Sequence, residues 1–121
     1  MSVVSARELA LDFAERIKTL GAISVSRFFG GAGLVVAGVQ FGFVMKGSLY
    51  LRVNDKTRPN FEALGAAPFT YAGRTDKVTV ATYYEAPCDV VDDPDELGRW
   101  ANEAHCAALA ARQRSRSAKR G

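Results

Sequence analysis

The sequence is poor in the residues that build disulfide frameworks, metal centres and membrane spans. It has two cysteines and one histidine among 121 residues. These are too few for a disulfide-stapled domain or for the four ligands that a structural zinc ion usually takes. No apolar run approaches the roughly 20 residues that a membrane helix needs, and the first residues lack the charge and apolar pattern of a secretory signal. We therefore expect free thiols at Cys88 and Cys106 and a cytoplasmic location.

Catalytic and phosphate-binding motifs are also missing. Gly30, Gly31 and Gly33 suggest a phosphate loop, but the dinucleotide fingerprint needs a further glycine where a valine stands, and there is no Gly-Lys-Ser/Thr of the Walker type. We interpret them as a turn in which at least one glycine has positive φ. A nucleophilic triad would have to use His105, but the adjacent Cys106 points elsewhere on a helix. The sequence therefore indicates no catalytic residue, no metal and no cofactor.

Positive charge is concentrated at the end of the chain. There are 16 basic and 13 acidic residues, a net charge of +3. Residues 112–121 hold five basic residues and no acid, so residues 1–111 have a net charge of −2. We expect one domain over 1–111 and a basic, disordered tail over 112–121. If the protein touches nucleic acid, this tail would supply the phosphate contacts: Arg112, Arg114, Arg116, Lys119 and Arg120.

Capping signals predict a helix near each end of the domain. Ser5 and Glu8 form a capping box before an apolar stripe of helical spacing. Near the other end, Asp93 is placed to cap a helix and Pro94 to take its first position. A second apolar stripe of helical spacing follows Pro94. We expect both helices to pack one face on the core, with inward side chains at Leu9, Phe13, Ile17, Leu97 and Trp100.

The segment between these helices has the period of β-strands. Short apolar and β-branched runs alternate with glycine or proline turns over about 23–85, which indicates antiparallel strands and hairpins. A short helix with Phe61 inward interrupts them. The predicted fold class is α+β: two layers, with an antiparallel sheet meander flanked by an N-terminal helix (about 6–20) and a C-terminal helix (about 94–111), and a short helix inserted between strands.

Nine aromatic residues fall on these strands and their turns. They could form a base-stacking surface like that of RNA-recognition sheets. Such sheets interleave aromatic residues with Lys and Arg, however, and these strands carry few basic residues. We therefore expect most of the nine to belong to the core: Phe28, Phe29, Phe41, Phe43, Tyr50, Phe69, Tyr71, Tyr83 and Tyr84.

Six blocks of sequence occur in the order of a known family. They are FFGGAGL at 28–34, QFGFV at 40–44, LYLRV at 49–53, PFTY at 68–71, YYEAP at 83–87 and DELGRWA at 95–101. Over about residues 5–111 the chain resembles the TfoX/Sxy N-terminal domain family. The resemblance implies a two-layer α+β fold with an antiparallel sheet between terminal helices. It also implies regulation of natural competence, the uptake of DNA, together with transcriptional activators, and no catalytic residues.

Three functions follow from the sequence and the resemblance. The first is a non-enzymatic regulatory module whose partner is a protein, a second copy of the chain or part of the transcription machinery. The alternative is a domain that associates weakly and non-specifically with nucleic acid through its basic tail. An enzyme has the least support. Full-length regulators add a helical C-terminal domain where this chain has the tail. The residues that we assign to specifying the fold are Gly30, Gly31, Gly33, Asp93, Pro94 and Trp100.

Overall fold

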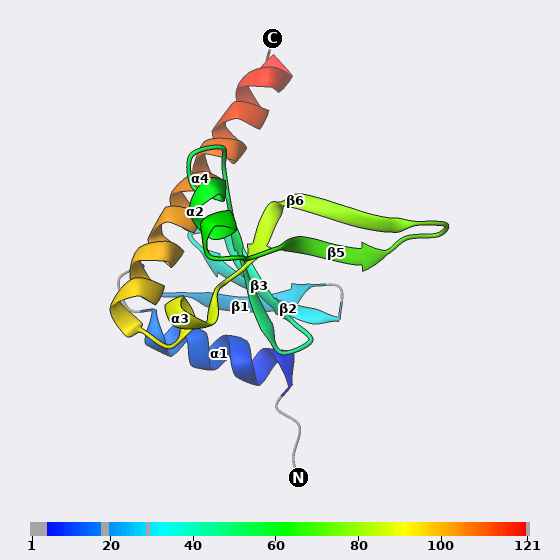
Figure 1. The fold of residues 1–121 in the computed structure, drawn as a ribbon. Coiled ribbons are helices and arrows are strands. Elements are labelled where there is room, and N and C mark those ends of the chain that lie inside the picture. Colours follow the sequence, from blue (N-terminus) through cyan, green and yellow to red (C-terminus); the bar gives the residue numbers. More distant parts are fainter. Residues whose placement is uncertain (1–4, 18–19, 29, 121) are drawn as a thin grey trace.

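The fold is an open six-stranded antiparallel sheet with helices at both ends of the chain (Figure 1). A computed structural model describes residues 5–17, 20–28 and 30–120, apart from the side chains of 114–120. The strand order is β1-β2-β3-β4-β6-β5. This confirms the predicted α+β class. The elements are α1 (Ala6–Arg16), β1 (Ser24–Phe28), β2 (Gly31–Val36), β3 (Val39–Met45), β4 (Ser48–Arg52), α2 (Arg58–Ala63), β5 (Pro68–Ala72), β6 (Lys77–Glu85), α3 (Cys88–Val91) and α4 (Pro94–Arg120).

Helix α1 begins as predicted but ends earlier. The Ser5 hydroxyl oxygen accepts a hydrogen bond from the Glu8 amide at 3.1 Å, which confirms the cap. The helix was predicted to reach about residue 20, yet it ends at Arg16, because Ile17 leaves the helical region with ψ at 80°. Ile17 is nevertheless completely buried. The turn therefore carries this side chain into the core, as the apolar stripe predicted.

Helix α4 is longer than predicted. Asp93 accepts hydrogen bonds from the amides of Asp95 at 3.0 Å and Glu96 at 3.3 Å, which confirms the cap. The helix continues to Arg120, through a segment for which a frayed end and disorder were expected. That segment consists of residues with fair to strong helix propensity and contains no proline or glycine before position 121. No helix in the described part of the chain is long and apolar enough to cross a membrane.

The core lies between one face of the sheet and the helices. Helix α1 packs on β1, β2 and β3, while α4 packs on β3 and β4. Small residues on α4 allow this helix to approach the sheet closely. Trp100 is only 7% exposed, and its ring centroid lies 4.6 Å from that of Phe61. The predicted inward residues Phe13, Ile17, Leu97 and Trp100 are buried, and Leu9 is partly buried against the same core.

A bulge in β3 decides which aromatic residues face the helices. The β3 partners of the consecutive residues Leu34 and Val35 are two residues apart, which leaves Phe41 as an extra residue. Side chains alternate between the faces of a strand, and an extra residue reverses that alternation. Phe41 therefore belongs to the core beneath the helices, whereas Phe43 lies on the opposite face. We call this second side the open face of the sheet.

The three-glycine segment is a strand connection. Gly30 has a φ of +84° in the turn between β1 and β2, which confirms that at least one of the three glycines has positive φ. Gly31 and Gly33 lie within β2 instead. A Cβ atom on Gly31 would overlap the carbonyl oxygen of Val44, and one on Gly33 would overlap the Gln40 side chain. Gly31 needs to be glycine because a backbone oxygen comes close, whereas at Gly33 the flexible Gln40 side chain would have to move.

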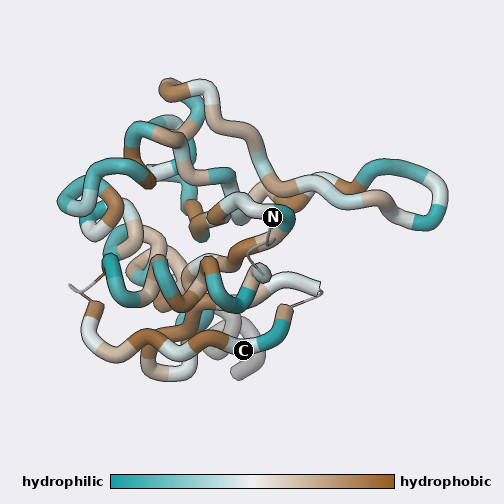
Figure 2. The backbone as a smooth tube through the Cα atoms, turned by 90° about the horizontal axis from the view of Figure 1, so that it is seen from below, coloured by the Kyte–Doolittle hydropathy of each residue, from teal (hydrophilic) through white to brown (hydrophobic). Residues whose placement is uncertain are grey.

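Strands β5 and β6 extend beyond the rest of the sheet as an arm (residues 68–82). Both views show this hairpin leaving the body, and its tip is hydrophilic (Figures 1 and 2). Only the last residues of β6, Tyr83 to Glu85, pair with β4. A two-stranded hairpin alone is at best marginally stable in water. The position of the arm therefore depends on contacts at its base.

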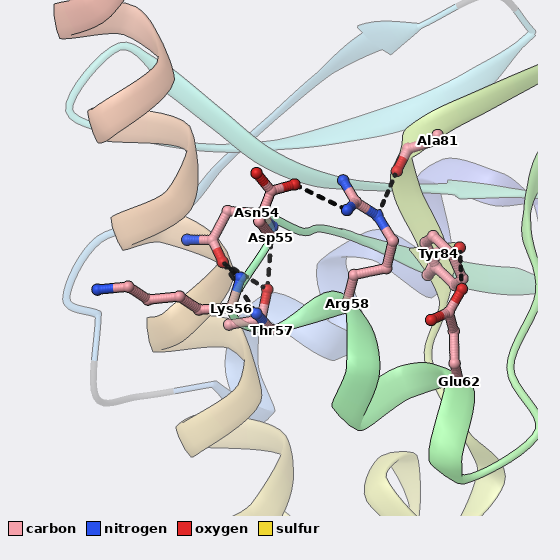
Figure 3. Close-up of polar contacts among 8 residues, drawn as sticks. All are labelled: Asn54, Asp55, Lys56, Thr57, Arg58, Glu62, Ala81 and Tyr84. Carbon is pink, nitrogen blue, oxygen red and sulfur yellow. Dashed lines mark hydrogen bonds and ion pairs between the residues drawn. The ribbon is translucent and has the colours of Figure 1, made fainter.

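A polar network at the base fixes the arm to α2 (Figure 3). The Tyr84 hydroxyl donates a hydrogen bond to Glu62 at 2.9 Å. Arg58 donates from Nε to the carbonyl oxygen of Ala81 at 3.4 Å and pairs with Asp55 at 2.9 Å. Burial, followed by the bond to Glu62, raises the pKa of Tyr84. These contacts hold β6 where it separates from β4.

Candidate functional site

Six aromatic side chains gather on the open face of the sheet. In β4 the buried core residues are Leu49 and Leu51, so Tyr50 and Arg52 point to the other side. Tyr50 contacts the rings of Phe43 and Phe69, which therefore share that side. The six residues come from β1, β3, β4, β5 and β6: Phe28, Phe43, Tyr50, Phe69, Tyr71 and Tyr83.

This arrangement corrects the prediction that most of the aromatic residues belong to the core. Of the nine considered, Phe41 and Tyr84 lie beneath the helices, and Phe29 lies outside the described residues. The other six form a second cluster on the open face. The sheet has apolar side chains on both faces, because of the bulge at Phe41 and the projecting arm.

Phe43 is the centre of this second cluster. Its ring centroid lies 4.5 Å from that of Phe28, 4.9 Å from those of Phe69 and Tyr83, and 5.1 Å from that of Tyr50. These separations are within the range of favourable aromatic pairs. Phe43 has no exposed surface, although it lies outside the core cluster beneath the helices. The surrounding rings therefore exclude water from it.

The aromatic cluster surrounds an apolar pocket of about 460 Å³. We call it the aromatic pocket. The strands β1 and β5 are the two edges of the sheet, and both contribute to its wall. The sheet therefore curls enough to bring its two edges to one cavity. The volume is in the range of sites that bury a small ligand or a few side chains. The pocket is lined by Phe28, Phe43, Met45, Phe69, Tyr71, Val80 and Tyr83.

An arginine without a charged partner lies beside the pocket. Arg52 is opposite Tyr83 in the pairing of β4 with β6, and its guanidinium carbon is 5.6 Å from the centroid of that ring. Arg52 makes no ion pair within the described residues. Its Nε atom is buried and lacks a hydrogen-bond acceptor among them. A buried donor without a partner costs about 1–3 kcal/mol, and the partly exposed residue leaves the guanidinium open to an acceptor from a ligand.

The strands around the pocket carry an excess of positive charge. No aspartate or glutamate occurs from residue 16 to residue 54. The segments 24–52 and 68–85 together contain five basic and two acidic residues. One acid, Glu85, lies opposite Tyr50. Burial and, to a lesser extent, this carboxylate raise the pKa of Tyr50, so its hydroxyl remains a neutral donor at physiological pH.

The other predicted site residues lie away from this pocket or outside the described side chains. Arg112 is exposed on α4, beside the turn at Gly38. The side chains of Arg114, Arg116, Lys119 and Arg120 are not among those described, so their contact with nucleic acid stays a prediction. Asp93, Pro94 and Trp100 lie at the start and on the buried face of α4.

The reactive residue types are dispersed. Cys88 and Cys106 are exposed and belong to α3 and α4. The His105 ring packs edge-on against Phe41 with a centroid distance of 6.2 Å, and its Nε2 atom is buried without a partner among the described residues. The described part of the chain contains no group of three His, Cys, Asp or Glu side chains suited to a metal ion.

Comparison with known proteins places the chain in a family. Residues 15–108 match the TfoX N-terminal domain, a span from the last two residues of α1 into α4 that includes the whole sheet. The match agrees with the resemblance of the six sequence blocks. No curated protein matches the chain. The matched domain is of a regulatory, non-catalytic type related to competence and DNA transformation. The chain therefore belongs to the TfoX N-terminal domain family.

Proposed function

We propose that this chain is a cytoplasmic, non-enzymatic regulatory domain that binds a protein partner through the aromatic pocket in the control of competence. The partner class includes the transcription machinery. The family supports the regulatory role, and the aromatic pocket is the single observation that supports protein binding. Exposed apolar surface that borders a pocket is characteristic of interaction sites.

Apolar side chains on the arm continue the surface of the aromatic pocket. Tyr71 is 49% exposed and Val78 is 37% exposed, and the two lie opposite each other in the pairing of β5 with β6. They extend the apolar surface from the pocket along the arm. A monomer gains little stability from holding such side chains in water, whereas a partner that covers them removes apolar area at about 25 cal/mol per Å².

Two exposed residues allow a test with little effect on folding. Tyr71→Ser changes the arm, and Leu11→Ser is the matched control because Leu11 is 44% exposed on α1, away from the open face. Each variant replaces the chromosomal copy in the source cell, and transformation frequency is measured with protein abundance. We expect Tyr71→Ser to lower the frequency and Leu11→Ser to leave it unchanged. Equal frequencies at equal abundance would argue against the proposal.

Nucleic-acid binding through the basic end of α4 is the second candidate function. The observation that favours it is the continuation of α4 through a segment with five basic residues. If each residue meets one phosphate, the slope of log affinity against log salt should be about −4 to −5. Fluorescence anisotropy with labelled duplex DNA would compare the natural chain with a variant in which all five are glutamine. Tight binding by the variant would place the contact elsewhere.

A further inference from the structure

We infer that the aromatic pocket recognises an acidic, extended segment of a partner protein, with a large apolar side chain in the pocket and a carboxylate on Arg52. This inference rests on the proposed function and specifies the chemistry of the partner. Three independent features of the open face support it: the apolar lining of the pocket, the Arg52 guanidinium and the position of β5 at the edge of the sheet.

The lining of the aromatic pocket fits an apolar side chain of the partner. Its walls are aromatic rings, Met45 and Val80, and the only polar atoms on these side chains are the Tyr71 and Tyr83 hydroxyls and a thioether sulfur. An aliphatic or aromatic side chain would lose its hydration and contact several rings. Large side chains that enter such pockets commonly supply most of the affinity of an interface.

Arg52 favours a carboxylate of the partner close to that apolar side chain. Arg52 and the pocket share Tyr83, because the guanidinium lies over the ring that forms the wall. Its Nε atom lacks an acceptor among the described residues, and residues 16–54 contain no acid that could pair with it. Arg52 as a residue is only partly buried, and a carboxylate on its guanidinium would form a charge-assisted hydrogen bond, which is stronger than a neutral one. Charge complementarity therefore favours an acidic partner.

The edge of β5 favours an extended segment. β5 ends the sheet, so one side of its backbone has no strand partner in the described part of the chain. Phe69 and Tyr71 are two residues apart on this edge and both line the pocket. A strand added beside them would present its own alternate side chains to the same face. Backbone pairing would supply affinity, and the pocket would supply selectivity.

Two other occupants fit less well. A second copy of the chain would bring the same excess of positive charge to the interface. Single-stranded nucleic acid uses aromatic residues along a basic groove that follows the phosphates. Here the rings enclose a pocket, and among the described side chains Arg52 is the cation without an ion pair that contacts its wall. Both occupants are separate outcomes of the experiment below.

The test selects ligands from a phage-displayed library of random 12-residue peptides on the full chain. We expect enrichment of peptides that combine acidic residues with aromatic or aliphatic residues at alternate positions. The affinity of a selected peptide is then measured for Arg52→Gln and for Arg7→Gln, a matched charge change on the exposed part of α1. Arg52→Gln should weaken binding at least tenfold, while Arg7→Gln should change it less than twofold. Arg52→Lys should weaken it less than Arg52→Gln, and urea unfolding confirms that each variant is folded.

The same peptide is tested with Tyr71→Ser and Leu11→Ser and by hydrogen exchange. Tyr71→Ser should weaken binding, and bound peptide should slow exchange of β5 amides. Failure to select peptides, selection of basic peptides, or equal binding by Arg52→Gln would overturn the inference. Tighter binding of an oligothymidylate that depends on Tyr71 would assign the pocket to nucleic acid, and concentration-dependent dimers lost in Tyr71→Ser would assign it to a second copy.

The outcome is separable from that of the proposed function. If Tyr71→Ser lowers transformation frequency but no acidic peptide is selected, the pocket has a partner of another chemistry and only this inference fails. If acidic peptides bind at Arg52 but transformation does not change, the binding chemistry holds and the competence role fails.

Discussion

Replacing Phe43 by alanine should destabilise the domain, because it removes the central ring of the second cluster. The side chain has no exposed surface and contacts four other rings with centroid separations from 4.5 to 5.1 Å. Truncating a fully buried phenylalanine to alanine lowers the free energy of unfolding by about 3–5 kcal/mol. Each pair of contacting rings contributes about 0.5–1.5 kcal/mol in addition to the effect of burying apolar area. Because the open face can partly collapse around the gap, we expect a loss near the lower figure, about 3 kcal/mol.

Urea titration followed by circular dichroism measures this loss by linear extrapolation. The matched control is Phe69→Ala, which removes a half-buried ring of the same cluster and should cost about half as much. The slope of unfolding free energy with urea should stay the same in both variants. A loss below about 1 kcal/mol for Phe43→Ala would show that the ring is solvated and that the second cluster does not form.

Three further predictions concern the core, the glycine turn and the tyrosines. Trp100→Ala should cost about 3–5 kcal/mol in the same titration, since Trp100 is 7% exposed, and a loss below about 1 kcal/mol would count against its burial. Gly30→Ala should lower the free energy of unfolding by about 1–2 kcal/mol through its φ of +84° alone. Gly31→Ala should lower it more, because the new Cβ would overlap a backbone oxygen. The reverse order would contradict this account. The pKa values of Tyr50 and Tyr84 are raised, so their contribution to stability is present below pH about 10 and is lost as pH rises through the folded pKa; ultraviolet titration in which all tyrosines ionise together would refute this.

Local signals made the starts of α1 and α4 predictable. The caps at Ser5 and Asp93 depend on residues within one turn, and both form as predicted. Lys46 and Gly47 both take positive φ between β3 and β4, as a type I′ hairpin turn requires. The length of α4 was missed because the prediction relied on apolar periodicity, which stops near residue 111, rather than on helix propensity.

The candidate site was not predictable because it depends on distant contacts. Phe28 and Tyr71 belong to opposite edges of the sheet, and only the curl of the sheet brings them to one pocket. The face chosen by Phe43 depends on the bulge at Phe41, which alternation alone does not reveal. The sequence did show many aromatic residues and few acids in the strands. This combination of many aromatic and few acidic residues in the strands was the signal in the sequence that pointed to the site.

Photo-crosslinking in the source cell tests most directly whether the open face binds a protein. A photoreactive phenylalanine analogue replaces Tyr71 on the arm or, in the control, Leu11 on α1, two side chains of similar exposure. Our account predicts a crosslinked protein of defined mass from position 71, lost when Arg52 is changed to glutamine, and none from position 11. The same adducts from both positions, or none from position 71 at matched abundance, would contradict it.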